Sequence, residues 1–293
     1  MMNLKQIKEA ALNLKGVAAE TPLMKNENLS EHFAAQVFLK REDLQPVRSY
    51  KLRGAYHKIS SLSNTETSNG IVCASAGNHA QGVAYACKKL QLKATIFMPL
   101  TTPAQKVKQV KLFGKEWVEV VLKGDTFDDA FAESQLFCAE HNATFIHPFD
   151  DEKVIAGQGT VGLEVLQQSQ QAIDYLFFPV GGGGLASGIA SVFKQLSPHT
   201  KLIGVEPEGA TSMKTSIKNG KNTTLEHIDK FVDGAAVKRV GDKTFEICKE
   251  LLDDIVVVPE GKVCTTILQL YNEEAIVVEP AGALSIAALD LMK

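Results

Sequence analysis

The feature that most constrains the fold is the alternation of short apolar runs with longer segments of helical spacing along the 293 residues. Runs of strand length fall at 37–39, 70–74, 94–98, 117–122, 144–146, 174–180, 202–205, 255–258 and 275–278. Helical spacing occurs at 4–14, 80–90, 126–141 and 185–196. Strands that alternate with helices of this length predict parallel sheets with crossover helices. We therefore expect an α/β protein with two open parallel-sheet domains.

Composition excludes several classes of protein. Hydrophobic residues make up 45% and charged residues 22% of the chain, as in ordinary soluble globular proteins. The net charge of −3 gives no reason to expect nucleic acid or an anionic membrane as partner. No apolar run approaches the roughly 18 residues that span a bilayer, and the start lacks a signal-peptide core. The five cysteines lack CxxC spacing and indicate reduced thiols in a cytoplasmic protein.

The stretch 49–55, Ser-Tyr-Lys-Leu-Arg-Gly-Ala, is the first candidate for chemistry. Ser49 is expected to cap a helix, which places Lys51 in the first turn. The positive end of the helix dipole disfavours an ammonium there, so the amine loses its proton more easily. A neutral lysine amine can attack an aldehyde and form an imine. Most lysines at helix starts are merely solvated, so this interpretation depends on the motifs that follow.

Four consecutive glycines, Gly181 to Gly184, stand between an apolar strand and a helix. Glycine backbone can approach an anion closely, and the N–H groups at a helix start are suitable donors. No Lys-Ser or Lys-Thr follows, so the loop is not a Walker-type loop. Gly181, Gly183 and Ala186 also fit the G-x-G-x-x-A dinucleotide pattern, with Glu206 at the end of the next strand. A nicotinamide or flavin site therefore remains open on these residues alone.

A third loop, Ser75-Ala76-Gly77-Asn78-His79, also joins a strand to a helix. Its hydroxyl, amide and helix-start N–H groups suit a carboxylate or a ring oxygen. An ordinary capped turn would have a similar composition. We therefore keep the loop as a candidate binding site.

Together these segments resemble the catalytic part of threonine dehydratase (threonine ammonia-lyase), one of the fold-type II pyridoxal-phosphate enzymes with a tryptophan synthase β-like fold. The resemblance runs from Thr21 to Ala288 and rests on five motifs in order: 49–55, 75–82, 179–185, 233–237 and 279–283. It removes the dinucleotide alternative and implies pyridoxal 5'-phosphate as the cofactor.

The resemblance also implies a role for each matched residue. Lys51 matches the lysine that holds the cofactor as an imine and acts as the catalytic base. Asn78 matches the partner of the ring's phenolic oxygen, and Tyr50 matches the aromatic residue beside the ring. Phosphate binding is implied for Gly181, Gly182, Gly183, Gly184 and Leu185. The substrate carboxylate is implied to bind at Ser75, Ala76, Gly77, Asn78 and His79. Active-site lining is implied for Asp233, Gly234 and Glu279.

For the whole chain, the resemblance implies a small domain, 51–149, inserted into a large domain formed by 1–50 and 150–293. The implied reaction converts L-threonine to 2-oxobutanoate and ammonia, with L-serine as a slower substrate. It is the first step of isoleucine biosynthesis if the full-length protein is biosynthetic. A homodimer or homotetramer in the cytoplasm is also implied. The family continues to a further strand and a serine that meets the pyridine nitrogen, so we expect a chain truncated at its C-terminus.

Other enzymes of the same fold remain as alternatives: L-serine dehydratase, serine racemase and β-replacement enzymes such as cysteine synthase. Racemases of this group place a serine acid/base where this chain has Ala76, which favours elimination. Their divalent-metal cluster begins at the residue matching Glu206, but position 212 is serine rather than aspartate, so the cluster is incomplete and Glu206 is only a weak metal candidate. A non-catalytic relative that only binds the cofactor is the non-enzyme alternative, and the intact Lys51 argues against it.

Overall fold

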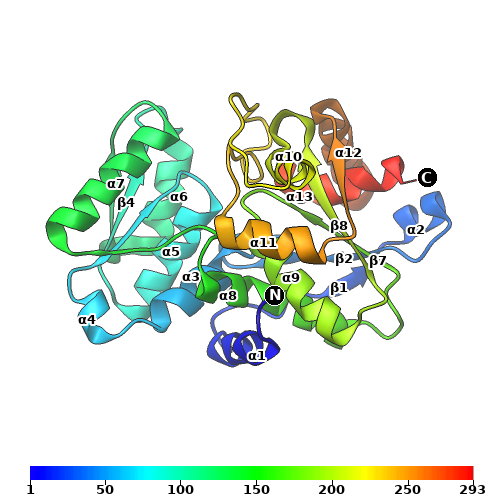
Figure 1. Ribbon diagram of the computed structural model, residues 1–293, viewed down its shortest axis with the longest axis horizontal. Helices are drawn as coiled ribbons and strands as arrows, with labels where there is room; N and C mark the ends of the chain where they lie inside the picture. Colours follow the sequence, from blue (N-terminus) through cyan, green and yellow to red (C-terminus); the bar gives the residue numbers. More distant parts are fainter. Residues whose placement is uncertain (293) are drawn as a thin grey trace.

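Two parallel sheets, lying side by side, organise the chain in the computed structural model, which describes residues 1–292 (Figure 1). The first has four strands in the order β5-β4-β3-β6, and the second has three in the order β7-β8-β9. A short antiparallel pair, β1 (Leu23–Lys25) and β2 (Phe38–Lys40), forms a third sheet. The predicted α/β class with parallel sheets is confirmed.

The four-stranded sheet comprises β3 (Ile71–Ala74), β4 (Ala94–Met98), β5 (Val118–Leu122) and β6 (Thr144–Phe145). Helices α5 (Asn78–Leu90), α6 (Ala104–Gly114) and α7 (Phe127–His141) connect its strands. Alternate residues of β3 enter different cores, because side chains alternate across a strand. Ile71 and Cys73 pack in one hydrophobic cluster with residues of α5, whereas Val72 and Ala74 pack in another with Ala130 of α7.

The three-stranded sheet comprises β7 (Tyr175–Pro179), β8 (Lys201–Pro207) and β9 (Asp254–Val258). Residues of α8 (Glu152–Gln168), α9 (Gly184–Leu196) and α11 (Asp242–Leu251) fill the core on one face. Residues of α12 (Glu260–Glu274) and α13 (Pro280–Ala287) fill the other. Helix α3 (Lys51–Ser60) carries the chain from the β1–β2 pair to the four-stranded sheet. The remaining α-helices are α1 (Leu4–Asn13), α2 (Glu27–Phe33), α4 (Asn64–Thr67) and α10 (Ser212–Asn219).

Helices α3, α8 and α9 pack through glycines. A Cβ atom on Gly157 of α8 would lie 2.6 Å from the Cα of Gly54 in α3. A Cβ atom on Gly188 of α9 would lie 2.5 Å from the backbone N of Gly159 in α8. Real Cβ atoms do not come this close, so the backbones of the three helices touch directly. This glycine seam joins the helix that begins at Lys51 to the three-stranded sheet.

A buried ion network lies beside the glycine seam. The side chain of Arg53 on α3 is 1% exposed and pairs with Glu42 and with Glu164 of α8. Lys40 pairs with the same Glu164 at 2.6 Å. Burial of a guanidinium requires such partners, because an unpaired charge in the core is very unfavourable. The network therefore fixes α3 against α8 two residues after Lys51.

One expected strand is not found in the structure. Residues 275–278 do not form a strand; Ala275 ends α12 in the left-handed conformation (φ 52°), and Val277 is 77% exposed. The apolar run is short, and periodicity alone does not distinguish a strand from a loop.

We propose the domain division into 51–149 and the flanking 1–50 with 150–293, since it separates the two parallel sheets.

Candidate active site

Lys51 is the first residue of α3, as expected, but Ser49 does not cap the helix. The cap position is Tyr50, which has helical backbone angles (φ −63°, ψ −15°) and makes no side-chain capping bond. The chain reaches α3 through a tight turn with Arg48 at φ 61°, so the helix begins one residue later than a Ser49 cap requires. Within residues 1–292 the hydroxyl of Ser49 is buried and has no hydrogen-bond partner. Such an orphan group beside Lys51 leaves hydrogen-bonding capacity for a ligand.

The amine of Lys51 is largely shielded from solvent. Its Nζ donates to the backbone oxygen of Pro148 at 3.1 Å and lies 5.7 Å from the ring centroid of Tyr50. Burial lowers the pKa of this amine to about 8, and the negative charge of Glu279 opposes the shift. Burial likewise raises the pKa of the Tyr50 phenol, so that side chain stays neutral. About a tenth of the Lys51 amine is therefore unprotonated at pH 7, far more than for an ordinary lysine.

The Asn78 loop follows β3 at its carboxyl end. The Ser75 hydroxyl accepts from the backbone N–H of Gly77 at 3.2 Å, and Asn78 is the first residue of α5. The Asn78 amide donates to Glu279 at 2.6 Å. This contact joins the four-stranded sheet to the start of α13. Asn78 and Glu279, separated by 201 positions, are therefore brought together.

His79 lies in the same loop, and its ring is buried beside the backbone of Ile146. The side chain is 3% exposed, and its Nε2 is 2.9 Å from the backbone oxygen of Ile146. A carbonyl only accepts, so the neutral tautomer carries its hydrogen on Nε2. Burial, and then the charge of Lys51, lowers the pKa of His79 to about 3. Only the backbone N–H of His79 suits the carboxylate site expected from the sequence.

The glycine loop connects β7 to α9, with Gly183 at the cap position and φ 92°. L-residues rarely adopt this left-handed conformation, which explains glycine there. Within residues 1–292 the backbone N–H groups of Gly181, Gly182 and Gly183 donate to no other group. A Cβ on Gly182 would lie 2.2 Å from the ring of Phe149. A phosphate fits this arrangement: free N–H donors at the start of a helix form an anion site. Leu185, next in the chain, is 7% exposed and packs in the core.

Residues 233–235 line the other side of the glycine loop. A Cβ on Gly181 would lie 3.0 Å from Ala235, and one on Gly234 would lie 3.3 Å from a carboxylate oxygen of Glu279. Asp233 forms an ion pair with Lys106 of α6, which reaches it from the four-stranded sheet. The protein atoms around Glu279 remove part of its hydration, which raises the pKa of its carboxyl, although the residue still contacts solvent. The sequence reasoning missed Lys106, because one lysine on a helix carries no motif.

The segment 147–150 was also missed. Pro148 accepts from Lys51, and Phe149 packs on two residues of the glycine loop, Gly182 and Gly184. The His147 Nδ1 accepts from the backbone N–H of Phe149 and of Asp150, which forms a tight turn. No residue pattern in this segment indicates a binding role. Its importance comes only from where the fold places it.

Glu206, the weak metal candidate, caps a helix. Its two carboxylate oxygens accept from the backbone N–H groups of Met213 and Lys214, at 2.7 and 2.9 Å, at the start of α10. Its side chain is completely buried, which raises its pKa to about 7. Among residues 1–292 no group of three or more His, Cys, Asp or Glu side chains could hold a metal ion. Glu206 therefore belongs to no such cluster in the described part of the chain.

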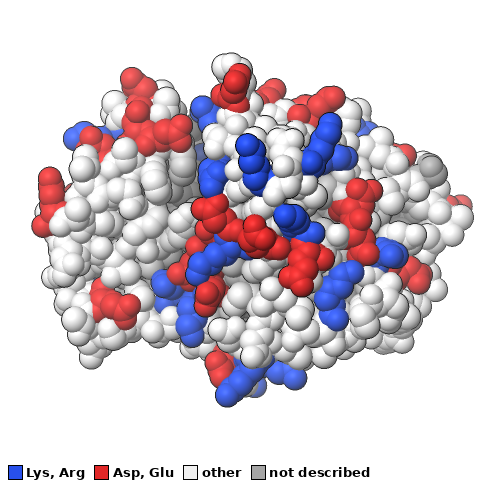
Figure 2. All heavy atoms as spheres, viewed as in Figure 1, with Lys and Arg blue, Asp and Glu red and all other residues white. Residues whose placement is uncertain are grey.

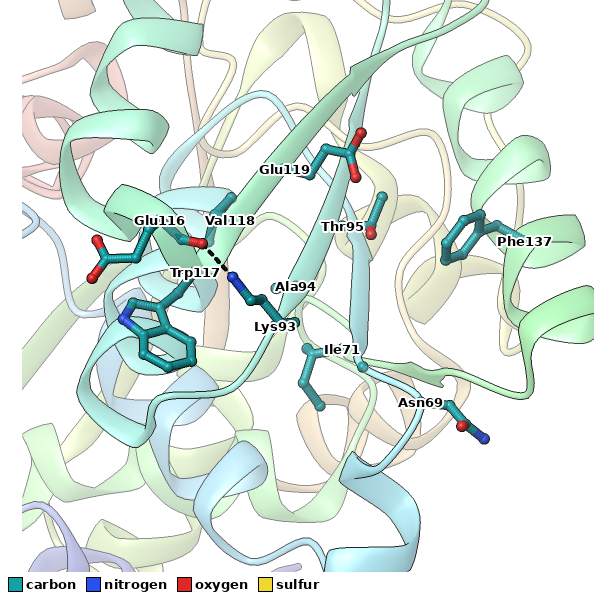
Figure 3. A pocket seen from close by; sticks show the side chains of 11 residues that line it. Asn69, Ile71, Lys93, Ala94, Thr95, Glu116, Trp117, Val118, Glu119 and Phe137 are labelled. Atoms are coloured by element: carbon teal, nitrogen blue, oxygen red, sulfur yellow. Dashed lines mark hydrogen bonds between the residues drawn. The ribbon is translucent and has the colours of Figure 1, made fainter.

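A cavity of about 330 Å³ lies at the opposite edge of the four-stranded sheet (Figure 3). It is lined by the first residues of β3 and β4, Ile71 and Ala94, and by Trp117. Lys93 points across it and donates to the backbone oxygen of Glu116 at 2.7 Å. Ligands of open parallel sheets bind at the carboxyl ends of the strands. This cavity lies at the amino ends, so we do not assign it to the Lys51 site.

Lys51, the Asn78 loop and the glycine loop are the candidate cofactor-binding groups, and the comparisons with known proteins identify the family. The family described as pyridoxal-phosphate dependent enzyme (PALP) matches residues 14–293, and the chain belongs to this family. Two relatives are each named "L-threonine dehydratase biosynthetic IlvA". That of Halalkalibacterium halodurans is 62% identical over 280 residues, 96% of this chain and 68% of the relative. That of Bacillus subtilis is 56% identical over 293 residues, 100% of this chain and 69% of the relative.

Solved structures show the same fold. The processed form of threonine deaminase isoform 2 from Solanum lycopersicum superposes with a TM-score of 0.94 at 42% identity, covering 99% of this chain and 80% of that one. Maize serine racemase also superposes with a TM-score of 0.94, at 32% identity, covering 98% of this chain and 86% of that one. The fold-type II class expected from the motifs is confirmed. Pyridoxal 5'-phosphate is the cofactor of this family.

Proposed function

We propose that this chain is the catalytic part of a pyridoxal-phosphate-dependent threonine dehydratase. It converts L-threonine to 2-oxobutanoate and ammonia, and L-serine is a slower substrate. Relatives at 56% and 62% identity carry the name of that enzyme. The word "biosynthetic" in their names supports a place at the first step of isoleucine biosynthesis.

The observation that carries the proposal is the partly buried amine of Lys51 at the start of α3, which donates to the Pro148 oxygen and has a pKa lowered to about 8. An amine that is partly neutral near the working pH can accept the proton from the Cα of the substrate. The cofactor, when bound, supplies the electron sink for this step. Lys51 thus combines covalent attachment with general base catalysis.

Other residues would hold and orient the reactants. The free N–H groups of Gly181 to Gly183 suit the cofactor phosphate. Asn78, beside Glu279, suits the ring oxygen, and Tyr50 lies beside the Lys51 amine. The loop from Ser75 to His79, at the start of α5, suits the substrate carboxylate. Asp233 and Gly234 complete the wall near Glu279.

The test is oxo-acid formation from L-threonine by the protein loaded with the cofactor. We expect turnover by the unmodified protein and none by Lys51→Ala. Lys58→Ala is the matched control: Lys58 lies on the same helix and pairs with Asp151 at 2.8 Å. That variant should retain turnover. Turnover by Lys51→Ala, or cysteine formation from O-acetylserine and sulfide without action on either hydroxy amino acid, would contradict the proposal.

Serine racemase is the second candidate, supported by the superposition on the maize enzyme. Ala76 opposes it, because a methyl group cannot transfer a proton to the opposite face of the substrate. A pocket that differs by one methyl group separates substrates by about 1–3 kcal/mol. We therefore expect both L-threonine and L-serine to react, and D-serine formation to be absent.

We also propose a cytoplasmic homodimer or homotetramer. No helix in the described residues has the length and apolarity to cross a bilayer. On the face in Figure 2, Lys and Arg side chains are interspersed with Asp and Glu, which favours neither nucleic acid nor an anionic membrane. Light scattering that shows only monomer at micromolar concentration would contradict the assembly.

A further inference from the structure

The start of helix α11 is packed against the glycine loop. The backbone oxygen of Gly182 accepts from the Thr244 hydroxyl at 2.6 Å and from the N–H of Gly241 at 3.3 Å. A Cβ on Gly183 would lie 2.8 Å from the Cβ of Thr244. One turn of α11 therefore fixes the direction of the Gly182 carbonyl.

The direction of this carbonyl also sets the direction of a donor. A trans peptide is planar, so the C=O of Gly182 and the N–H of Gly183 point to opposite sides. Because α11 holds the carbonyl, the N–H of Gly183 faces away from α11. Within residues 1–292 this N–H donates to no other group. This N–H is therefore available to an anion on the side of the loop that faces away from α11.

Helix α11 has no capping side chain of its own, because its cap residue is Gly241. The carboxylate of Asp150, 92 positions earlier, accepts from the N–H groups of Asp242 and Lys243 at 3.0 Å each. It also accepts from the N–H of Thr244 at 3.2 Å. A carboxylate at a helix N-terminus satisfies free donors and interacts favourably with the dipole. Asp150 thus holds in place the turn that contains Thr244.

Asp150 belongs to the segment 147–150 that already contacts the site. Pro148 accepts from Lys51, and the ring of Phe149 packs on Gly182. The same segment therefore touches the reactive amine, the glycine loop and the helix that orients the loop. No pattern in the sequence assigned a role to Asp150 or Thr244.

We propose that Asp150 and Thr244 are positioning residues for the cofactor phosphate. Thr244 orients the Gly182–Gly183 peptide so that its N–H faces the phosphate, and Asp150 holds the helix turn that carries Thr244. The inference rests on the proposed pyridoxal-phosphate site and adds residues that determine its phosphate affinity.

The test compares two ligands on the cofactor-free protein. Dissociation constants are measured for pyridoxal 5'-phosphate and for pyridoxal, which lacks the phosphate. Thr244→Val keeps the shape of the side chain and removes the hydroxyl. We expect it to weaken phosphate-form binding about fivefold, the equivalent of one net hydrogen bond, and to leave pyridoxal binding unchanged. Thr244→Ser keeps the hydroxyl and should bind both ligands like the unmodified protein.

The ratio of the affinity for pyridoxal 5'-phosphate to the affinity for pyridoxal should fall further in Asp150→Ala than in Thr244→Val. Asp150→Asn keeps an acceptor oxygen, so this ratio should fall less in it than in Asp150→Ala. Asp151→Ala is the matched control. Asp151 caps α8 through the N–H groups of Lys153 and Val154, so its loss should lower thermal stability without changing the ratio. If Asp150→Ala does not fold, the Thr244 pair tests the same link without altering the helix cap.

Two outcomes would overturn the inference. In the first, the unmodified protein binds the cofactor through Lys51, but Thr244→Val weakens the binding of both ligands equally or of neither. Only the positioning role is then wrong. If the unmodified protein does not bind pyridoxal 5'-phosphate, the proposed function is wrong and the positioning role falls with it.

Discussion

The lowered pKa of Lys51 predicts a pH dependence for cofactor attachment. A lysine amine normally has a pKa near 10.5, and burial here lowers it to about 8. This shift corresponds to about 3 kcal/mol of preference for the neutral amine. At pH 8 about half of the Lys51 amine is neutral, against about 0.3% for an ordinary lysine. The neutral amine is the nucleophile, so attachment should accelerate as the pH rises and level off above about 8.

The assay follows the absorbance of lysine-bound cofactor after pyridoxal 5'-phosphate is added to the cofactor-free protein between pH 6.5 and 10. Rates are divided by those of an alkoxyamine, which stays unprotonated throughout this pH range, so the titration of the cofactor itself is removed and that of Lys51 is kept. Lys51→Ala should give no such band. Glu279→Gln removes a charge that stabilises the ammonium, so it should move the midpoint below that of the unmodified protein. A midpoint near 10.5, or an upward shift in Glu279→Gln, would refute the reasoning.

Three further predictions concern the surrounding structure. Arg53→Met leaves the Glu42 carboxylate without a cation and Glu164 with Lys40 alone, so it should reduce the free energy of unfolding by about 3–5 kcal/mol in urea titrations. A loss below about 1 kcal/mol would contradict the assigned network. Lys106→Glu opposes Asp233 with a like charge and should raise KM for L-threonine up to about fivefold, with kcat little changed. The exchange Lys106→Glu with Asp233→Lys should restore KM, and Lys123→Glu, in an exposed pair elsewhere, should not change it. The Glu206 carboxyl binds its proton more tightly in the folded than in the unfolded protein, so its ionisation destabilises the fold as the pH rises from about 4.5 to 7. The free energy of unfolding of Glu206→Gln, relative to that of the unmodified protein, should therefore increase by about 3 kcal/mol over this range. A difference that stays constant with pH would contradict the raised pKa.

The sequence predicts the parts of the site that have a local signature. Lys51 at a helix start, the loop at Asn78 and the four glycines each follow a strand or turn pattern that is visible in the sequence. Their contacts in the fold are consistent with the roles that we propose for them. Ser49 shows the limit of local reasoning. Serine is a common capping residue, but the turn at Arg48 shifts the helix start, and tertiary structure overrides the preference.

Residues that act through long-range contacts were not predictable from local pattern. Asp150 caps a helix that begins 92 positions later, and Lys106 pairs with a carboxylate 127 positions away. Neither has a composition or spacing that separates it from surface residues. Helix α8 was also missed, because most of its residues are buried and it lacks the polar face that marks an amphipathic helix. Such features depend on which elements the fold places together.

The glycine seam makes the position of Lys51 sensitive to changes made far from it in sequence. Gly54 lies three residues, or about 4.5 Å along the helix axis, beyond Lys51. A methyl group on Gly157 would stand 2.6 Å from the Cα of Gly54, so α3 and α8 would have to separate by about 1 Å to accommodate it. A displacement of that size at a reacting group can reduce the rate about 100-fold. A side chain at position 157 would therefore displace α3, and with it Lys51, and should lower the reaction rate without contacting the substrate.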